Sequence, residues 1–325
     1  MAELTFLQAV NQALDEEMSR DPNIIILGED VRLWGAPRGE FKGLFEKYGP
    51  DRVLDTPISE TAILGGAIGA AATGLRPIAN IMYANFLGVC GDEILNQLTQ
   101  LRYMVAGKIK LPVTIMSYCG AGFSAGAHHS KTVHGLLMAI PGLKIAFPST
   151  PRDAKGLLKS AIRDDNPVIF LSHQMLMRRG LKEEISDEEY VIPLGVANIK
   201  REGADVTVVS SGFMVQRALA VADKLQEENI SVEVIDPRTW MPLDRKTIIE
   251  SVKKTSRLVI LEEEPITGGA AAEIVATVSE KAFDFLDAPI KRVCAPDTPI
   301  PFSPVLEQAW IPSEKKLITA IKEVV

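Results

Sequence analysis

The stretch that most restricts the fold of this chain is residues 53–72, where a strand end runs directly into a helix of small side chains. Val53 and Leu54 are typical of a strand end, and Ser59 followed by Glu60 is typical of a helix start. This order predicts that Glu60 lies where a parallel sheet meets its crossover helix, the edge at which open α/β sheets bind ligands. The helix is rich in Gly and Ala and lacks a polar face, so we expect it to be buried, against a second subunit.

Short apolar runs alternate with amphipathic helical patterns through the rest of the chain. The runs typical of buried parallel strands lie at residues 24–27, 76–82, 112–116, 143–147 and 167–171, then at 206–210, 231–235, 257–261 and 290–294. The helical patterns lie at residues 6–18, 92–104, 150–163, 215–227, 244–253 and 270–285. This alternation predicts the fold class α/β, with two open, mainly parallel sheets.

A charged run divides the alternation into two halves. It begins with Lys182, Glu183 and Glu184 and ends at Glu189. Because 325 residues are enough for two domains of ordinary size, we predict a first domain at 1–181, a linker at 182–194 and a second domain at 195–325.

Composition argues against several classes of protein. The net charge of −7 is modest and no cluster of Lys and Arg alternates with aromatic residues, so no nucleic acid partner is expected. No apolar run reaches the roughly 18 residues of a membrane span, so no membrane association is expected. The first residues, Met1-Ala2-Glu3, are acidic where a signal peptide would be basic. We therefore expect a soluble protein of the cytoplasm, or of an organelle after removal of a leader.

The cysteines and histidines form no clear metal motif. The three cysteines (Cys90, Cys119 and Cys294) are odd in number and show no Cys-x-x-Cys spacing, so we expect small buried apolar side chains without disulfides. Three of the four histidines (His128, His129 and His134) lie within seven positions of a glycine-rich segment. Composition alone allows a metal triad there, but adjacent histidines on an extended chain point apart and no carboxylate is near in sequence.

Several segments match one known pattern. They are Gly-Glu-Asp-Val (28–31), Asp-Thr-Pro-Ile-Ser-Glu (55–60), Gly-Leu-Arg-Pro (74–77), Pro-Gly-Leu-Lys (141–144), Asp-Ala-Lys-Gly-Leu-Leu (153–158), Ala-Ile-Arg-Asp (161–164), Asp-Pro-Arg-Thr (236–239) and Leu-Asp-Ala-Pro (286–289). Together they resemble the beta subunits of the thiamine-diphosphate-dependent component of 2-oxo acid dehydrogenase complexes, including the related acetoin dehydrogenases. The resemblance covers nearly the whole chain and implies a pyrimidine-binding domain followed by a domain like the transketolase C-terminal domain.

The resemblance gives Glu60 the role of the cofactor-activating glutamate. Thiamine diphosphate reacts through C2 of its thiazolium ring, and the base that removes the C2 proton is the cofactor's own 4′-amino group. A carboxylate hydrogen-bonded to N1′ of the pyrimidine favours the imino tautomer that acts as this base. Without the resemblance, Glu60 would be interpreted as a helix-start residue that interacts with the helix dipole.

The resemblance also assigns roles to Phe86 and His129. Phe86 matches the aromatic residue whose ring packs on the aminopyrimidine, and an ordinary core Phe is the alternative. His129 aligns with the family histidine that handles protons during reductive acyl transfer to a lipoyl group, a role that suits imidazole near neutral pH. His128 should point to the opposite side of the chain. The residue after Ser130, usually Gln in the family, is Lys131, which changes the charge near the site.

Two further assignments stay open between alternatives. Glu29 is assigned to cofactor binding and fits, with Asp92, a buried acidic path near the cofactor, although charged strand ends are commonly only solvated or hydrogen-bonded. The resemblance also implies a potassium site, since a hard cation prefers oxygen ligands. Its ligands would come from Val113, Ala161, Ile162, Asp164 and Asn166. The alternative is a capped helix end at residues 164–167 without any ion.

One motif expected for such an enzyme is missing. Enzymes of this type hold the diphosphate and Mg²⁺ with a Gly-Asp-Gly motif and a later Asn, because the metal needs oxygen ligands. This sequence has only Gly91-Asp92-Glu93. In the family an alpha subunit carries the motif, so the resemblance implies a heterotetramer of two alpha and two beta chains. The second domain would serve beta–beta assembly and docking of the lipoyl-bearing dihydrolipoyl acyltransferase.

These observations lead to one functional hypothesis and three alternatives. The hypothesis is a beta subunit, active only with its alpha subunit, that cleaves the C–C bond next to the carbonyl of acetoin or pyruvate and transfers the acetyl group to a lipoyl domain. Residues 88–90, 120–123 and 302–304 look more like the acetoin branch. The alternatives are a branched-chain 2-oxo acid dehydrogenase subunit, a noncatalytic assembly subunit, and a self-sufficient transketolase-like enzyme. The presence of both Glu60 and His129 disfavours the second, and the missing motif and the length disfavour the third.

Overall fold

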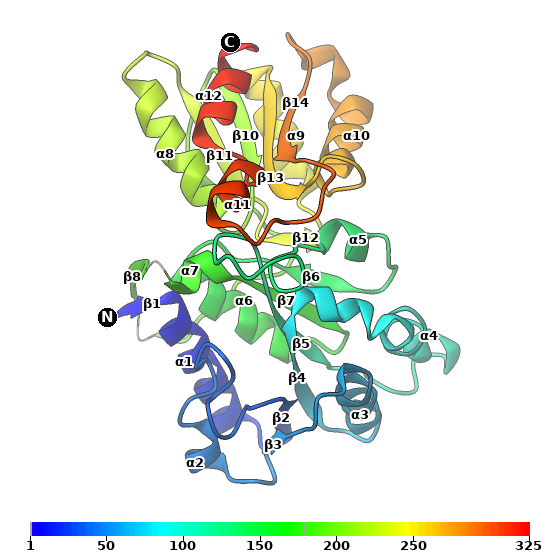
Figure 1. Cartoon of the computed structure of the whole chain (residues 1–325). Coiled ribbons are helices and arrows are strands. Elements are labelled where there is room, and N and C mark those ends of the chain that lie inside the picture. Colours follow the sequence, from blue (N-terminus) through cyan, green and yellow to red (C-terminus); the bar gives the residue numbers. More distant parts are fainter. Residues whose placement is uncertain (1, 179, 187) are drawn as a thin grey trace.

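Two open sheets, each packed between helices, form the two lobes of this chain (Figure 1). The computed structural model describes residues 2–178, 180–186 and 188–325. One lobe holds a seven-stranded sheet and the other a five-stranded sheet. In each sheet all neighbouring strands pair in parallel except one antiparallel edge strand, which confirms the predicted α/β class with mainly parallel sheets.

The seven-stranded sheet has the order β12-β6-β7-β5-β4-β2-β3. Its strands are β2 (Ile24–Gly28), β3 (Val53–Asp55), β4 (Arg76–Tyr83), β5 (Thr114–Cys119), β6 (Lys144–Ala146), β7 (Val168–His173) and β12 (Thr239–Met241). The central strands are buried on both faces, which is why they appear in the sequence as continuous apolar runs.

The helices of this lobe contribute to two separate hydrophobic cores. Helices α1 (Phe6–Arg20) and α6 (Pro151–Arg163) supply side chains to one core, and α3 (Glu60–Ala72), η2 (Glu93–Leu98) and α5 (His134–Met138) supply the other. Helix α1 begins at Phe6, where the predicted helical pattern starts, and Thr5 caps it: the Thr5 hydroxyl accepts from the Gln8 backbone N–H at 3.3 Å while the Gln8 side chain accepts from the Thr5 N–H at 2.9 Å. Shorter helical segments are α2 (Leu44–Tyr48), η1 (Ala84–Gly88), α4 (Leu101–Met104) and α7 (Gln174–Arg178).

Helix α3 buries one side in the single chain and exposes the side that carries Gly65 and Gly66, so its expected packing against a second subunit stays a prediction. One expectation for this lobe is wrong. The helix predicted at 92–104 is instead the π-helical segment η2 followed by α4. The Thr99 hydroxyl donates to the carbonyls of Ile94 and Leu95 at 3.1 Å each, so the side chain takes carbonyls that a continuous helix would use.

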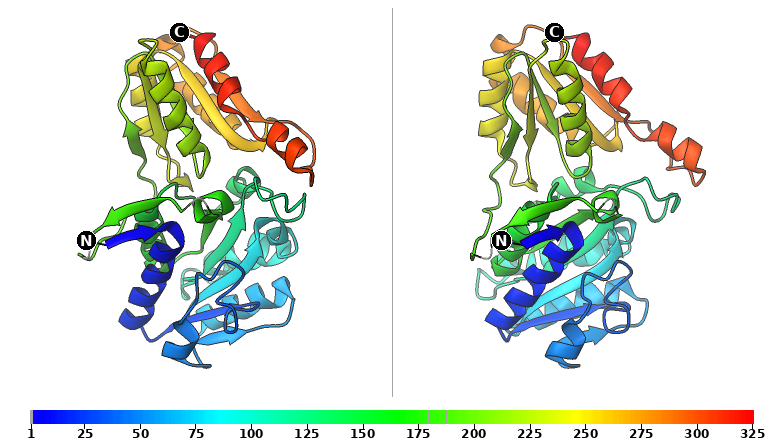
Figure 2. Two further views of the ribbon diagram at one scale, coloured as in Figure 1. Left: turned by 60° about the vertical axis from the view of Figure 1, so that its left-hand side comes forward. Right: turned by 90° about the vertical axis from the view of Figure 1, so that its left-hand side faces the viewer.

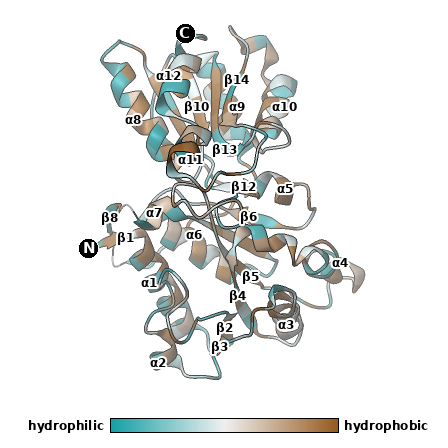
Figure 3. Cartoon of the chain, viewed as in Figure 1, coloured by the Kyte–Doolittle hydropathy of each residue, from teal (hydrophilic) through white to brown (hydrophobic). Residues whose placement is uncertain are grey.

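The five-stranded sheet has the order β14-β13-β10-β11-β9. Its strands are β9 (Asn198–Arg201), β10 (Val206–Ser210), β11 (Val232–Asp236), β13 (Leu258–Pro265) and β14 (Lys291–Ala295). Its helices are α8 (Met214–Gln226), α9 (Arg245–Thr255), α10 (Ala271–Lys281), η3 (Phe283–Phe285), α11 (Pro304–Trp310) and α12 (Glu314–Lys322). Figure 3 shows mainly hydrophobic strands in this sheet and a largely hydrophilic α12 on the outside.

The two lobes share more structure than the sequence indicated. Strand β12, from the second half of the chain, forms the edge of the first-half sheet by pairing with β6. Strand β8 (Lys182–Ile185), which falls in the predicted linker, pairs antiparallel with β1 (Ala2–Thr5) and lies beside it in both views of Figure 2. The start of that segment is therefore part of a sheet, and the division into domains at 181 and 195 stays a prediction. Both hydrophobic cores contain residues from both halves.

The cysteines and the helices bear on two further expectations. Cys90 and Cys119 are buried as predicted, whereas Cys294 is partly exposed, and all three are free thiols. Among the described residues, no helix combines the length and the apolar character that a membrane crossing requires.

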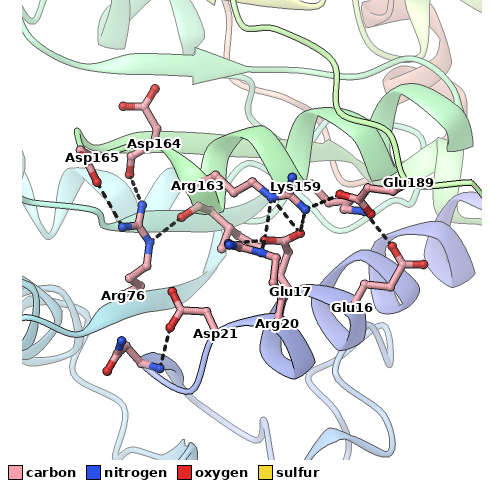
Figure 4. A network of polar contacts seen from close by, with 12 residues as sticks. Glu16, Glu17, Arg20, Asp21, Arg76, Lys159, Arg163, Asp164, Asp165 and Glu189 are labelled. Atoms are coloured by element: carbon pink, nitrogen blue, oxygen red, sulfur yellow. Dashed lines mark hydrogen bonds and ion pairs between the residues drawn. The ribbon is translucent and has the colours of Figure 1, made fainter.

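Ion pairs with buried charges join α1 to α6 (Figure 4). The Arg163 guanidinium donates through Nε to both oxygens of the fully buried Glu17, at 3.0 and 3.1 Å, and Arg20 donates to the same carboxylate at 2.9 Å. The Lys159 ammonium, also fully buried, lies 2.9 Å from a Glu16 oxygen. Because removal of one partner leaves the other charge in a poorly solvated place, this network makes the α1–α6 contact depend on each member.

We expect Glu17→Ala to lower the free energy of unfolding by about 2 kcal/mol, since the charged hydrogen bonds of Arg163 and Arg20 to Glu17 are lost while both arginines stay partly exposed to water. Urea unfolding measures this loss. The matched control is Glu228→Ala, which breaks the exposed pair with Lys322 and should cost less than about 1 kcal/mol. Equal losses in the two variants would show that burial of Glu17 has no special weight.

Candidate active site

The candidate site begins at the carboxyl ends of β2 and β3. The Thr56 N–H donates to the Gly28 carbonyl at 3.0 Å, and the Arg32 N–H donates to the Asp55 carboxylate at 2.8 Å. These contacts fix the chain that leads from β3 to Glu60, the first residue of α3. Helix α3 thus begins at Glu60, as predicted. It begins at the edge where parallel strands end and where open α/β sheets bind ligands.

Glu60 is half-buried and has no hydrogen-bond or ion-pair partner among the residues that the structure describes. Glu60 affects the neighbouring Glu29. Burial raises the pKa of Glu29, and the negative charges of Glu60 and Asp30 raise it further. The Thr61 hydroxyl donates to the Val89 carbonyl at 3.2 Å and so connects the first turn of α3 to the segment after η1. The site therefore holds two neighbouring carboxylates, and neither has a hydrogen-bond or ion-pair partner among the described residues. Asp92 is exposed in the single chain and accepts from the Asn96 side chain at 2.6 Å, so the acidic path stays a prediction.

An aromatic cluster lies at the carboxyl ends of β4 and β5. It joins Tyr83, Phe86, Tyr118 and His129. The His129 ring lies edge to face against Tyr83 at 4.4 Å and against Phe86 at 5.6 Å, centroid to centroid. Tyr83 contacts Tyr118 at 5.9 Å. The structure thus brings together Phe86 and His129, which the sequence placed in one site without any information on their separation.

The two adjacent histidines point in different directions, as predicted. His129 is half-buried in the aromatic cluster, whereas His128 is exposed and lines a cavity of about 610 Å³ that also contacts Lys131, Pro299 and Trp310. This cavity lies between the segment that carries the histidines and residues of the second half. Lys131 is exposed, and its backbone N–H donates to the Asn85 side chain at 3.2 Å.

The segment before the histidines requires glycine at two positions. Gly120 and Gly122 have φ of +94° and +113°, values that other residues rarely adopt. A Cβ at Gly120 would lie 2.2 Å from Nε2 of His173, and a Cβ at Gly122 would lie 2.7 Å from Sδ of Met175. The amide of Gln174 donates to the Gly120 carbonyl at 3.0 Å and to the His129 carbonyl at 2.6 Å, so it holds the segment at two points.

A buried acid lies behind the aromatic cluster. The Tyr118 hydroxyl donates to the carboxyl group of Glu40, which is 1% exposed. Burial raises the pKa of Glu40 to about 8, although its own backbone N–H and the charge of Arg38 act in the opposite direction. Glu40 is therefore mainly protonated and neutral at pH 7. No sequence signal marked Glu40 or Tyr83.

The proposed potassium ligands already have partners in this structure. Arg76 donates to the Ile162 carbonyl at 3.0 Å, and the Asp164 carboxylate accepts from Lys144 and from the Asn166 side chain. The carbonyls of Val113 and Ala161 accept backbone N–H groups. These contacts form the capped helix end that was the alternative, with the side-chain cations of Arg76 and Lys144 bound to two of the proposed ligands. The potassium site stays a prediction.

One group of potential metal ligands is found among the described residues, and it is not the histidine triad. It consists of His134, Glu262 and Glu264, all buried, with ligand atoms within 4.8 Å of one another. The oxygens are already occupied, because Glu262 accepts from the Ala271 N–H at 2.7 Å and Glu264 accepts from the Ala270 N–H at 3.0 Å. We therefore interpret the group as an internal hydrogen-bond network.

Comparison with known proteins identifies the family of this chain. Residues 2–179 match the pyrimidine binding domain of transketolase, and residues 195–317 match the transketolase C-terminal domain. The beta subunits of acetoin:2,6-dichlorophenolindophenol oxidoreductase from Cupriavidus necator and Bacillus subtilis are 48% and 45% identical to the chain, over 98% of the chain and 97% and 96% of the relatives. The chain belongs to the family of acetoin and 2-oxo acid dehydrogenase beta subunits.

Other relatives agree with this family. The pyruvate dehydrogenase E1 component subunit beta of Bacillus subtilis is 42% identical over 100% of the chain and 99% of the relative. A solved structure described as split gene transketolase, inactive beta4 tetramer, aligns with a TM-score of 0.80 at 24% identity and covers 99% of this chain and 98% of that one. At this identity the solved structure supports the transketolase-like fold alone.

The residues of this beta subunit fit the pyrimidine half of thiamine diphosphate, on which the family depends. Glu60 offers a carboxylate that nothing in the described chain satisfies, at the ligand edge of the sheet. Phe86, partly exposed beside His129, offers an apolar ring to an aromatic ligand. The sequence offers no Gly-Asp-Gly motif for the diphosphate and its metal.

Glu40 generates a prediction for stability. Between pH 4.5 and about 8 the folded chain keeps a proton on Glu40 that the unfolded chain releases, so this group makes stability fall as pH rises through that range. We expect Glu40→Gln, which mimics the neutral acid, to gain stability relative to the wild type from pH 5 to pH 8 by a few kcal/mol, on the order set by the size of the shift. Urea unfolding at several pH values measures the difference.

The control for this experiment is Glu46→Gln, which changes an exposed acid on α2. Its stability difference from the wild type should not depend on pH. A Glu40→Gln difference that is equally flat from pH 5 to pH 8 would contradict a neutral Glu40 in the folded chain.

Proposed function

We propose that this chain is the beta subunit of a thiamine-diphosphate-dependent dehydrogenase that acts on acetoin or pyruvate and passes an acetyl group to a lipoyl domain. The observation that carries the proposal is the half-site itself: an unpartnered Glu60 next to Glu29, and the aromatic cluster of Phe86 and His129 at the same edge of the parallel sheet. The identity of 45–48% to two acetoin oxidoreductase beta subunits, over nearly the full chain, supports acetoin as the first substrate to test.

Each residue has a defined task in this proposal. When bound, thiamine diphosphate supplies the electron sink that allows cleavage of the bond next to a carbonyl. Glu60 accepts a hydrogen bond from N1′ of the pyrimidine and so sets its tautomer. Phe86 packs on the ring and fixes its orientation. Glu29, whose pKa is raised by burial and by the charge of Glu60, lies next to it as a second carboxylate at this edge of the sheet.

His129 is proposed to move protons during acyl transfer. In that step the lipoyl disulfide is reduced to a thioester and a thiol, while the two-carbon unit is oxidised from the aldehyde level to an acetyl group. The new thiol needs a proton, and a half-buried imidazole next to Tyr83 and Phe86 is placed to supply it. With acetoin the other product is acetaldehyde, and with pyruvate it is CO₂.

An alpha subunit completes the site in this proposal. It would hold the diphosphate and Mg²⁺, for which this chain has no motif. Gly65 and Gly66 lie on the exposed side of α3, the helix that begins with Glu60. An alpha subunit that packs against these glycines would therefore lie close to the cofactor bound by Glu60. Assembly as two alpha and two beta chains, with the acyltransferase as a further partner, follows from the same reasoning.

Glu60→Gln should lower turnover of the alpha–beta enzyme by at least about 100-fold, because the amide cannot exchange a proton with N1′. Reduction of 2,6-dichlorophenolindophenol with acetoin as substrate measures the rate. Thermal unfolding should be unchanged, since Glu60 has no partner in the described chain. The control is Asp51→Asn, an exposed acid before β3. Wild-type turnover in Glu60→Gln would refute the assignment.

Assay of the chain alone and with its alpha subunit tests the proposal as a whole. We expect no turnover by the chain alone, and turnover with the alpha subunit for acetoin or pyruvate in preference to branched 2-oxo acids. Turnover by the chain alone would favour a transketolase-like enzyme. No turnover with any substrate in the presence of an alpha subunit that binds it would favour a noncatalytic assembly role.

A further inference from the structure

The segment that carries the histidines is bound at both ends by the second half of the chain. This segment, residues 120–135, which we term the histidine loop, runs from the end of β5 to the start of α5. It forms little regular structure of its own. Figures 1 and 2 show it facing α11 of the other lobe, and α11 and the loop lie on the same side in both views of Figure 2. Its position must therefore come from contacts with other elements.

The first contact is with Glu307 on α11. Its two carboxylate oxygens accept from the backbone N–H groups of Gly122 and Ser124, each at 2.9 Å, and the Ser124 hydroxyl lies 3.3 Å away. Glu307 is 1% exposed. Gly122 and Ser124 both have positive φ, of +113° and +54°. Such a backbone turns successive N–H groups toward one point and forms a concave anion site, which the Glu307 carboxylate fills.

Strand β13 supplies three more carboxylates in succession. Glu263 accepts from the Ala121 N–H at 2.5 Å and contacts the His173 ring at 3.0 Å. Glu264 accepts from the Gly135 N–H at 2.9 and 3.0 Å. Glu262 lies 2.6 Å from Nε2 of His134. All three are at most 4% exposed. Both ends of the histidine loop are thus bound by carboxylates of the second half.

We propose that Glu307 and Glu262 to Glu264 form a carboxylate clamp that sets the position of His129, and that the second half of the chain thereby acts in catalysis through the histidine loop. This inference rests on the proposed role of His129. The clamp residues are positioning residues, since they contact the loop and not the aromatic cluster. Charge-assisted hydrogen bonds to backbone N–H groups in a dry interface are strong and directional, as such a task requires. The middle of the loop is held from the first half: the Gln174 amide donates to the His129 carbonyl at 2.6 Å, and the Asn85 side chain donates to the Ala127 carbonyl at 2.8 Å and accepts from the Lys131 N–H at 3.2 Å.

Glu307→Gln in the alpha–beta enzyme tests the clamp. The amide keeps the shape but turns an NH₂ group toward one of the two N–H donors, so the loop should shift. We expect acetylation of the lipoyl domain to fall about 10- to 100-fold in kcat, because small displacements of a catalytic group have effects of this size. The KM for acetoin and the reduction of 2,6-dichlorophenolindophenol, which needs no lipoyl group, should change less than about threefold.

A loss of lipoyl acetylation without an equal loss of dye reduction distinguishes a positioning role from general destabilisation. His129→Ala should show the same split, and Glu307→Gln should add little to it in the double variant if both act through one histidine. Hydrogen exchange followed by mass spectrometry, which needs no turnover, should show faster exchange at residues 121–124 in Glu307→Gln. The control Glu314→Gln, on α12, breaks only an exposed pair with Lys224 and should match the wild type in every assay.

Three results would overturn the inference. They are equal losses in both assays, an additive loss in the double variant, and unchanged exchange at residues 121–124. Wild-type lipoyl acetylation in His129→Ala would instead contradict the proposed function, while the exchange result would still report on the clamp. If Glu307→Gln does not assemble with the alpha subunit, Glu307→Asp keeps the charge on a shorter side chain, and a smaller loss with the same split is expected.

Discussion

Parallel pairing of β2 with β3 and β4, and of β4 with β5, is the constraint on which the candidate site depends. Because parallel strands end at the same edge of a sheet, the segments that follow them meet there, whatever their distance along the chain. Glu29 follows β2, Glu60 follows β3, Phe86 follows β4, and the histidine loop follows β5. Two hydrophobic cores fix the faces of the sheet, so this edge is a rigid frame on which polar side chains can be held without partners of their own.

The features that sequence could predict are those with local causes. The continuous apolar strands follow from burial on both faces, and the start of α1 follows from the Thr5 cap. Helix α3 begins at Glu60 as predicted, although the Ser59 side chain makes no capping hydrogen bond. The divergence of His128 and His129 follows from the alternation of side chains on an extended backbone. Membership of Phe86 and His129 in one site came from the resemblance and not from spacing. The ring contact at 5.6 Å shows why the resemblance was informative, since it joins residues from two different loops.

The features that sequence could not predict depend on contacts between distant parts of the chain. Glu307 and Gly122 are 185 positions apart, and nothing near Glu307 in the sequence marks it as a partner of a loop in the other half. Strand β12 is only three residues long, and it is stabilised by antiparallel pairing with β6 in the first half. The charged segment at 182–185 looked like a linker because its polar side chains gave no apolar pattern, yet its backbone pairs with β1. Glu40 is an ordinary acid in the sequence, and only burial against Tyr118 makes it neutral.

Three glutamates have different properties because their surroundings differ. Glu40 is buried next to a hydroxyl and keeps its proton, so it contributes no charge. Glu307 is equally buried but faces two backbone N–H donors, one for each oxygen, and its burial leaves a ligand no access to it. Glu60 has neither kind of partner among the described residues and is half-buried at the sheet edge. An acid that must bond to a cofactor cannot already be satisfied within its own chain, because breaking an internal hydrogen bond would offset the one gained. By this criterion Glu60 is the one of the three that is suited to activate a cofactor, and the other two support the frame around it.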